Sequence, residues 1–261
     1  MLFSSRYHSW SLNSLSRSDR MDRSKALTTL DIVTGLLMAG ATAMVFFYAP
    51  LEAVMGEVQK VFYFHVAAGW VGMLSFLVAA ACGVIYLVSA RKDPLKAVYW
   101  DRVAVAAVEI GMVFAFINIV TGAIWARPIW NTWWTWDPRL TTATIMELVY
   151  AAYLMLRQGI DDPEKRARFG AVYAIIGFMS VPFTFFSIRI FRTIHPIVIG
   201  TNEAGAMGAF DMTPKMAQTF IVSLVVFSVL FVDVLWHRIR LAALADKVEQ
   251  LKLQWESQGG E

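Results

Sequence analysis

The stretch WNTWWTWDPRL, residues 130–140, places four tryptophans within seven residues and follows them with Asp137 and Arg139. With Trp125, five of the ten tryptophans of the chain fall between residues 125 and 136. An indole is large and flat, and its N–H group needs a hydrogen-bond partner when it is buried. The stretch therefore indicates either an anchor at a membrane interface or a platform for a large flat ligand.

Histidine is the second residue type here that could do chemistry, because imidazole is the commonest metal ligand in proteins. We expect two of the four histidines, His8 and His237, to be solvated, one in a polar tail and one at the end of an apolar run. His65, in FYFHVAAGW, and His195, in FRTIHP, are the candidate ligands. The single cysteine, Cys82, excludes a disulfide framework and the CxxCH haem-attachment motif.

The elements that position these residues are predicted to be membrane-spanning helices. Of the 261 residues, 57% are hydrophobic and only 16% are charged. A helix needs about 20 apolar residues to cross the hydrocarbon core of a bilayer. Six apolar runs fit or approach this length: 27–48, 61–88, 103–124, 141–156, 169–190 and 216–236. We therefore predict an all-α, polytopic membrane protein with six transmembrane helices.

Positive charges decide how this protein is oriented in the membrane. With a cytoplasmic N-terminus, the inner segments hold 17 of the 23 lysines and arginines, and they are 1–26, 89–102, 157–168 and 237–261. Cytoplasmic loops are enriched in Lys and Arg, so both termini are predicted to be cytoplasmic. The Trp-rich segment 125–140, between the third and fourth spans, then faces outward, which is the periplasmic side of an inner membrane.

This topology divides the chain into three parts. Residues 1–25 are polar and basic and lack the apolar core of a signal peptide, which predicts a disordered cytoplasmic tail. Residues 26–236 form the membrane domain. Residues 237–261 are predicted to form a cytoplasmic amphipathic helix, which could contact a partner or lie on the membrane surface. Its apolar residues follow a 3,4,3,4 spacing: Leu241, Leu244, Val248, Leu251 and Trp255.

The predicted topology brings His65 and His195 to the outer interface, at the level of the Trp-rich segment. Aromatic belts occur at both membrane interfaces, but the cytoplasmic helix ends carry only Trp100 and Trp236. Zinc sites usually have three or four protein ligands, whereas haem needs only axial ligands and is flat and apolar. The cations near this face that could pair with haem propionates are Lys60, Arg127, Arg139, Arg189 and Arg192.

Two local features leave alternatives open. The sequence DPRLTT predicts a loop that closes into the fourth helix, with Thr141 or Thr142 as its cap. Gly69 and Gly72 lie four and seven residues after the first candidate ligand. They predict either a shallow groove on that face of the helix or close packing of two helices, for which small residues are equally suited.

These motifs resemble those of a known family. WARPIWNTWWTWDPRLT, together with the histidines of FYFHVAAGW and FRTIHP, is similar to the haem-handling proteins of cytochrome c maturation, which share a tryptophan-rich motif that ends in Asp. The length, the six spans and the single pair of outer histidines resemble the CcmC type in particular. The resemblance covers about residues 27–236. Asn131 stands where the family typically has Gly, and Asn can also adopt a positive φ.

The resemblance implies a haem-binding and transfer subunit rather than an enzyme. Haem b would be bound transiently at the outer face, with His65 and His195 as axial ligands of the iron, and presented to the periplasmic haem chaperone CcmE. The subunit would work in a complex with the ABC-transporter subunits CcmA and CcmB and the small membrane subunit CcmD, with ATP hydrolysis on a partner chain. The implied platform is Trp125, Trp130, Trp133, Trp134 and Trp136.

Three further positions follow from the same resemblance. Asp137 occupies the acidic position of the motif, Arg139 matches its arginine, and Lys60 stands where some members have Arg. Arg139 and Lys60 are expected to pair with the propionates. Asp137 could anchor the loop by accepting N–H bonds or could contact the chaperone, and the sequence does not separate these roles.

Three other functions remain as alternatives. One is a purely structural membrane subunit, which would leave the two outer histidines unexplained. A b-type haem subunit for electron transfer across the membrane would usually need two haems at different depths, hence four histidines on the spans. A haem permease would need polar residues at the midplane and broken helices, and Pro182 is the only strong breaker in the spans. No GxxxxGK[ST] phosphate loop occurs, and we predict contact with membrane lipid but with no nucleic acid.

Overall fold

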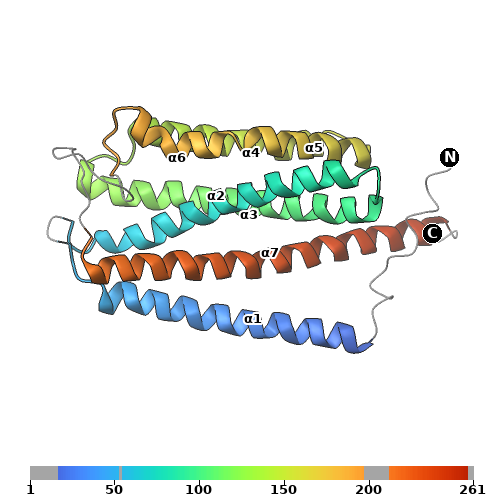
Figure 1. Cartoon of the computed structure of the whole chain (residues 1–261), viewed down its shortest axis with the longest axis horizontal. Helices are drawn as coiled ribbons and strands as arrows, with labels where there is room; N and C mark the ends of the chain where they lie inside the picture. Colours follow the sequence, from blue (N-terminus) through green and yellow to red (C-terminus); the bar gives the residue numbers. More distant parts are fainter. Residues whose placement is uncertain (1–16, 53–54, 197–211, 258–261) are drawn as a thin grey trace.

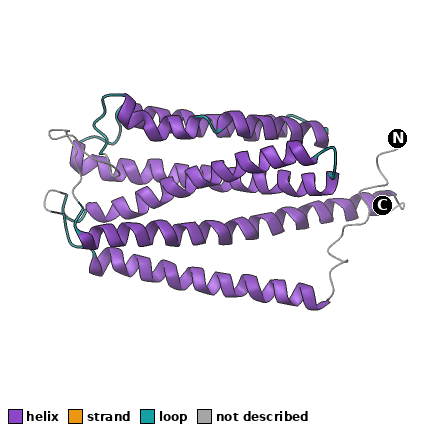
Figure 2. Ribbon diagram, in the orientation of Figure 1, coloured by secondary structure: helices purple, strands orange, loops and turns teal. Residues whose placement is uncertain are grey.

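The chain folds into a bundle of long helices that lie side by side (Figures 1 and 2). The computed structural model describes residues 17–52, 55–196 and 212–257, and within them there is no β-strand, which confirms the all-α prediction. The elements in chain order are α1 (Arg17–Ala43), the π-helical turn η2 (Met44–Tyr48), α2 (Gln59–Ser89), α3 (Pro94–Trp130), α4 (Pro138–Gln158), α5 (Pro163–Gly177), α6 (Ser180–Ile190) and α7 (Pro214–Ser257).

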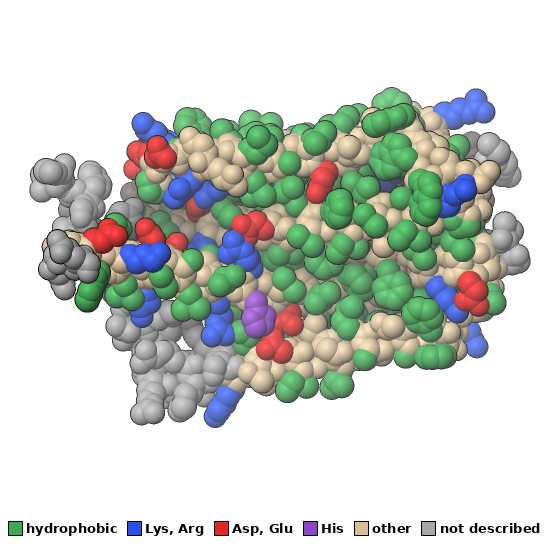
Figure 3. All heavy atoms as spheres, turned by 180° about the vertical axis from the view of Figure 1, so that it is seen from behind, with side chains coloured by type: hydrophobic (Ala, Val, Ile, Leu, Met, Phe, Trp, Pro, Cys, Tyr) green, Lys and Arg blue, Asp and Glu red, His purple; other side chains and the backbone are tan. Residues whose placement is uncertain are grey.

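Different helix ends and turns lie at the two ends of the bundle. α1 begins and α7 ends at one end, on the right of Figure 1, whereas α2 begins and α3 turns into α4 at the other. Most charged side chains gather toward the two ends, and apolar side chains cover much of the surface between them (Figure 3). This distribution is expected of helices that cross a bilayer, since lipid tails cannot solvate charges.

Five helical segments within the described residues are long and apolar enough to cross a membrane. They are Lys25–Tyr48, Gln59–Ser89, Pro94–Trp130, Pro163–Ile190 and Pro214–Ser257. The prediction of a polytopic membrane protein is therefore supported by the helices themselves. α4 has 21 residues but is not among these segments, so a sixth span stays a prediction.

The predicted fifth span consists of two helices, because the chain breaks between α5 and α6. Pro182 has no N–H group and cannot donate to the carbonyl of Phe178, four residues earlier. The N–H of Val181 donates to that carbonyl instead, at 3.0 Å. The break therefore falls one turn before the proline, and α6 carries the chain onward to the end of the bundle where α3 meets α4.

α2 and α3 form a closely packed pair at the centre of the bundle. A Cβ atom on Gly72 would lie 3.3 Å from the backbone nitrogen of Ala115, and one on Gly69 would lie 2.8 Å from Nδ2 of Asn118. Small residues allow helices to approach this closely. Of the two interpretations of these glycines, the structure therefore supports close packing rather than a groove.

The ends of the chain depart from the predicted division. α1 begins at Arg17, so residues 17–25 are helical rather than disordered, and residues 1–16 lie outside the described part. α7 runs without a break to Ser257, so the predicted C-terminal amphipathic helix is the continuation of α7. Residues 197–211 lie outside the described part. The apolar stripe on the end of α7 is exposed: Leu241, Leu244, Val248, Leu251 and Trp255.

Ion pairs join helices toward the end of the bundle that holds the start of α1. Arg157 of α4 donates two hydrogen bonds to Asp101 of α3, at 2.7 and 2.9 Å. Arg238 of α7 pairs with Glu109 of α3, at 2.8 Å. A bidentate arginine–carboxylate pair is strong and directional, so α3 is fixed against both α4 and α7.

Candidate functional site

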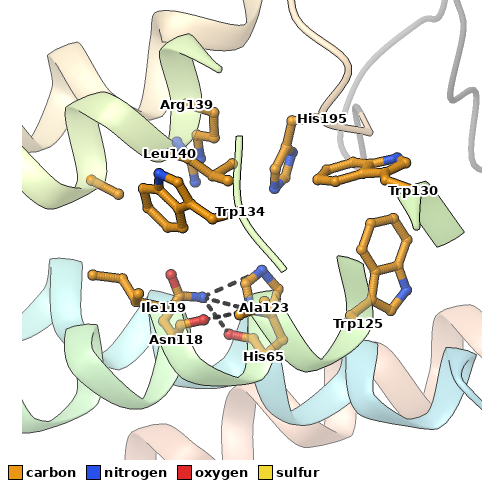
Figure 4. A pocket seen from close by; sticks show the side chains of 12 residues that line it. His65, Asn118, Ile119, Ala123, Trp125, Trp130, Trp134, Arg139, Leu140 and His195 are labelled. Atoms are coloured by element: carbon orange, nitrogen blue, oxygen red, sulfur yellow. Dashed lines mark hydrogen bonds between the residues drawn. The ribbon is translucent and has the colours of Figure 1, made fainter. Parts of the chain in front are cut away.

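A pocket opens at the end of the bundle where α3 turns into α4 (Figure 4). It encloses about 510 Å³ of space that no protein atom fills, part of it open to solvent. Both candidate ligands face it, from α2 and from the segment after α6. The residues that line it are His65, Asn118, Ile119, Gly122, Ala123, Trp125, Trp130, Trp134, Arg139, Leu140, Ala143 and His195.

His65 is held by a cluster of residues from α3. Its Nδ1 lies 2.9 Å from the backbone oxygen of Asn118, and Nδ2 of Asn118 donates to the backbone oxygen of His65 at 2.8 Å. A carbonyl oxygen can only accept, so Nδ1 carries the proton and Nε2 keeps its lone pair. A Cβ atom on Gly122 would lie 2.9 Å from Cε1 of the imidazole, so the absence of a side chain there makes room for the ring.

His195 is held in the same tautomer by its own segment. Its Nδ1 lies 3.0 Å from the backbone oxygen of Pro196, so this nitrogen donates and Nε2 is again free. Burial lowers the pKa of His195 well below its ordinary value, and the positive charge of Arg139 lowers that pKa further. The imidazole is therefore neutral at neutral pH, which is the form that binds a metal ion.

The two imidazoles lie at a separation suited to one metal ion. Their ring centroids are 6.5 Å apart and the planes are tilted by 39°. With metal–nitrogen bonds of about 2.0 Å, an ion held between two imidazoles places their centroids about 6.3 Å apart. The prediction that His65 and His195 lie at one level is therefore confirmed, and their spacing can accommodate ligands on opposite sides of one ion.

Asp137 joins two separate parts of this site. It is the N-cap of α4, where its carboxylate accepts the N–H of Arg139 at 2.9 Å. The same carboxylate accepts the hydroxyl of Thr193 at 2.7 Å and the N–H of Ile194 at 2.9 Å. The hydroxyl of Thr193 in turn accepts the N–H of His195 at 3.0 Å. Asp137 therefore positions the segment that carries the second histidine, as the anchoring role predicts.

The prediction that Thr141 or Thr142 caps the fourth helix is wrong. α4 begins one turn earlier, with Asp137 as N-cap and Pro138 in the first turn. Proline favours the first helical position because its missing N–H is not needed there. The hydroxyl of Thr142 donates to the backbone oxygen of Pro138 at 2.7 Å and lies within the helix.

The Trp-rich segment divides into an inner and an outer part. Trp125, Trp130 and Trp134 line the pocket, and the rings of the first two meet edge to face at 5.2 Å. Trp133 and Trp136 do not line it, and they are 59% and 76% exposed. The predicted platform thus has three indoles at the pocket, and the other two face outward.

A left-handed residue makes the turn that separates these indoles. Asn131 has a φ of 54°, and it ends α3 as its C-cap. Arg127 donates to the backbone oxygen of Asn131 at 2.8 Å and also to its side-chain oxygen. The expectation that Asn131 can adopt a positive φ is confirmed.

Of the two cations assigned to propionates, the structure brings one to the pocket. Arg139 lines it beside His195, with its guanidinium donating to the backbone oxygen of Thr184 at 2.5 Å. Lys60 does not line it and pairs with Glu57 at 2.5 Å. Lys60 is five residues before His65, which on a helix turns its side chain about 140° away.

Four lining residues of α3 were not predicted: Asn118, Ile119, Gly122 and Ala123. Their spacing could have indicated their place in the site. Asn118 and Gly122 precede Trp125 by seven and three residues, which places all three on one face of the helix. An asparagine within an apolar run is costly in lipid unless it has a partner. Reading these positions as one face would have indicated that α3 contributes a wall of the site.

The chain is similar to proteins of one family. A family model described as heme exporter protein C matches residues 11–254. The heme exporter protein C of Bradyrhizobium diazoefficiens is 30% identical over 209 residues, covering 80% of this chain and 76% of that protein. The protein of the same name from Rhodobacter capsulatus is 29% identical over 231 residues, covering 87% and 88%. A putative cytochrome c biosynthesis ccmC-like mitochondrial protein of Marchantia polymorpha is 30% identical over 159 residues, covering 61% and 64%.

Proposed function

Because the chain belongs to the heme exporter protein C family, we propose that its pocket holds haem b, with His65 and His195 as axial ligands of the iron. Membership gives the chain a role in haem handling for cytochrome c biogenesis. The observation that carries the ligand assignment is the 6.5 Å separation of the two imidazole centroids. Nδ1 of each ring donates to a backbone carbonyl, which leaves the lone pair on Nε2 of each ring for the iron, although Nδ2 of Asn118 lies 3.5 Å from Nε2 of His65.

The remaining lining residues suit the rest of a haem. The ring is flat and apolar, and the indoles of Trp125, Trp130 and Trp134 offer flat apolar walls. Arg139 is the cation placed to pair with a propionate. Trp133 and Trp136 would extend the platform to the side from which a partner takes the haem. Lys60 could join the second propionate only by leaving Glu57.

Holding a cargo for transfer requires ligation that can be reversed. The chain binds haem through two neutral imidazoles, so neither ligand needs to lose a proton on binding or regain one on release. Asp137 orients the segment of His195 through Thr193 and Ile194. His65 lies within a helix, whereas this segment lies outside any helix and is held by the hydrogen bonds of one side chain. It is therefore the part of the site that can move when haem leaves.

We further propose how the subunit is placed and what it works with. α4 completes six spans in the inner membrane, both termini are cytoplasmic, and the pocket faces the periplasm. This is supported by the 17 lysines and arginines in the inner segments and by the position of the pocket, opposite the end where α1 begins. Haem is presented to CcmE, in a complex with CcmA, CcmB and CcmD, and a partner chain hydrolyses ATP.

The electron-transfer and permease alternatives gain no support from the site. A second haem would need a second pair of ligands at another depth. His237, on α7, lies away from the pocket and pairs with Asp31 of α1 at 2.6 Å, so it has no second histidine as a partner among the described residues. A permease site is expected near the midplane, whereas this pocket lies at one end of the bundle.

An absorption spectrum of the purified protein tests the proposal. The wild type should co-purify with haem and show a six-coordinate, low-spin spectrum. His65→Ala and His195→Ala should each lose at least about tenfold in haem affinity and fail to load CcmE, because one axial bond is missing. His237→Ala is the matched control and should retain haem. Full haem content and loading in both pocket variants would refute the ligand assignment.

A further inference from the structure

A second cluster of ligating side chains lies between α1 and α7, on the half of the bundle away from the pocket. Nε2 of His237 lies 2.6 Å from Oδ1 of Asp31 and 3.6 Å from Oδ1 of Asp233. One ligand atom from each residue lies within 4.8 Å of the others. Figure 3 shows carboxylates gathered beside a histidine side chain on this face. His237 is exposed, as the sequence suggested, and it also contacts two acids.

The hydrogen bonds within this cluster leave one carboxylate oxygen unsatisfied. Nε2 carries one proton and donates to Asp31, the nearer acid. Oδ1 of Asp233 then accepts no hydrogen bond from any described residue, although the Asp233 side chain is only 10% exposed. A buried carboxylate oxygen that accepts no hydrogen bond is destabilising, most of all beside lipid, and the contact with Nε2 of His237, at 3.6 Å, is too long to be one. The vacant oxygen points toward His237, so the centre of the cluster is where a compensating charge belongs.

The chemistry and spacing of the three groups fit a metal ion at that centre. Two carboxylates and a neutral imidazole carry two negative charges, which a divalent ion neutralises. Ligands at about 2.0–2.2 Å in tetrahedral geometry lie about 3.3 Å apart. The Asp233–His237 pair, at 3.6 Å, is already close to this spacing, and the Asp31–His237 pair, at 2.6 Å, needs to open slightly. His237 and Asp31 are 52% and 42% exposed, so an ion can enter and a water can complete its coordination.

We propose that Asp31, Asp233 and His237 bind a divalent first-row transition ion of the Zn²⁺ class, which links α1 to α7. The ion replaces the single proton on Nε2, and all three side chains then bind it at once. α1 packs mainly against α7, at the edge of the bundle (Figure 1). Bridging these two helices therefore fixes the most peripheral helix of the bundle, independently of haem and of the pocket.

Zinc titration of the full-length protein tests this site. The protein is purified without a histidine tag, stripped with a chelator, and titrated with Zn²⁺ against a chromophoric competitor. The wild type should bind one equivalent. Asp233→Asn and His237→Gln should each weaken Zn²⁺ affinity at least tenfold. Asp246→Asn is the matched control, because it removes the same charge from the same helix at a pair with Arg102, and it should change affinity less than twofold.

Two further measurements make the result decisive. The double variant His65→Ala/His195→Ala should bind Zn²⁺ as the wild type does, which excludes the pocket as the zinc site. Zn²⁺ should slow amide hydrogen exchange around Asp31 in the wild type. If Asp233→Asn does not fold, the exposed Asp31→Asn replaces it. Absence of a one-equivalent site in the wild type would overturn the proposal. So would Zn²⁺ affinities of the Asp31, Asp233 and His237 variants equal to that of the wild type. The cluster would then be only a hydrogen-bonded contact between α1 and α7.

Discussion

The carboxylate of Asp137 accepts the hydroxyl of Thr193 at 2.7 Å, and this contact joins the Trp-rich motif to the segment of the second candidate ligand. The two residues are 56 positions apart in the sequence. Asp137 also accepts the N–H of Ile194 and caps α4. One side chain therefore sets where the fourth helix begins and where the segment before His195 lies, which is a structural reason for an acid at the end of the motif.

Replacing Asp137 should reveal which of its two predicted roles dominates. Asp137→Ala removes the helix cap, worth about 1 kcal/mol, and charged hydrogen bonds worth about 1.5–3 kcal/mol each. We expect haem affinity and thermal stability both to fall, with CcmE loading lost as a consequence. Asp137→Asn keeps one oxygen acceptor and should retain part of the haem. Haem content is measured by the pyridine haemochrome assay.

A purely chaperone-facing role for Asp137 makes the opposite prediction. In that case Asp137→Ala would keep its haem content and spectrum and lose only the transfer of haem to CcmE. Thr193→Val serves as the matched variant, because it removes the partner hydroxyl without changing any charge. If the two residues act together, the double variant should lose less haem than the sum of the single losses.

Gly122 should be needed for the position of His65. A methyl group at Gly122 would lie 2.9 Å from Cε1 of the imidazole, so Gly122→Ala pushes the ring aside. We expect haem affinity to fall about tenfold, as for other changes that misplace a metal ligand, with a shifted absorption maximum. Gly35→Ala in α1 is the control, because a Cβ atom there meets nothing within 4 Å. It should keep full haem and gain up to about 1 kcal/mol of helix stability.

The gathering of His65, His195 and Arg139 at one end of the bundle could be predicted from sequence, because the topology set their depth in the membrane and the resemblance singled out these positions. The supporting residues could not, since the partner of His65 depends on how α3 is turned against α2. Asn118 and Gly122 look like ordinary packing residues until that register is known. Lys60 was assigned through the resemblance, and its place outside the pocket follows from helix geometry, because five residues along a helix place a side chain on another face.

Asn131 should tolerate glycine and reject alanine. Its φ of 54° lies in the left-handed region, which costs most side chains about 1–2 kcal/mol. Asn131→Gly should therefore keep haem content and stability close to those of the wild type, and it retains the backbone oxygen that accepts Arg127. Asn131→Ala should lower the melting temperature and reduce haem content, because the turn that separates Trp130 from Trp133 is strained. Equal behaviour of the two variants would mean that the turn contributes nothing to the pocket.

Arg139, rather than Lys60, should recognise the haem propionates. Arg139 faces the pocket beside His195, whereas Lys60 pairs with Glu57 outside it. A hydrogen bond between charged groups contributes about 1.5–3 kcal/mol, or roughly 10- to 100-fold in affinity. We therefore expect Arg139→Gln to weaken haem binding at least tenfold, and Lys60→Gln to change it less than about twofold.

Haem dimethyl ester separates loss of this contact from general damage to the pocket, because esterification removes the negative charges and leaves the ring and the iron unchanged. The wild type should bind haem at least tenfold more tightly than the ester. In Arg139→Gln this preference should nearly vanish, while affinity for the ester itself stays within about threefold of that of the wild type. Lys60→Gln should keep the full preference. If the preference disappears in Lys60→Gln and survives in Arg139→Gln, then Lys60 leaves Glu57 when haem binds, and the pairing seen between them belongs to the haem-free protein.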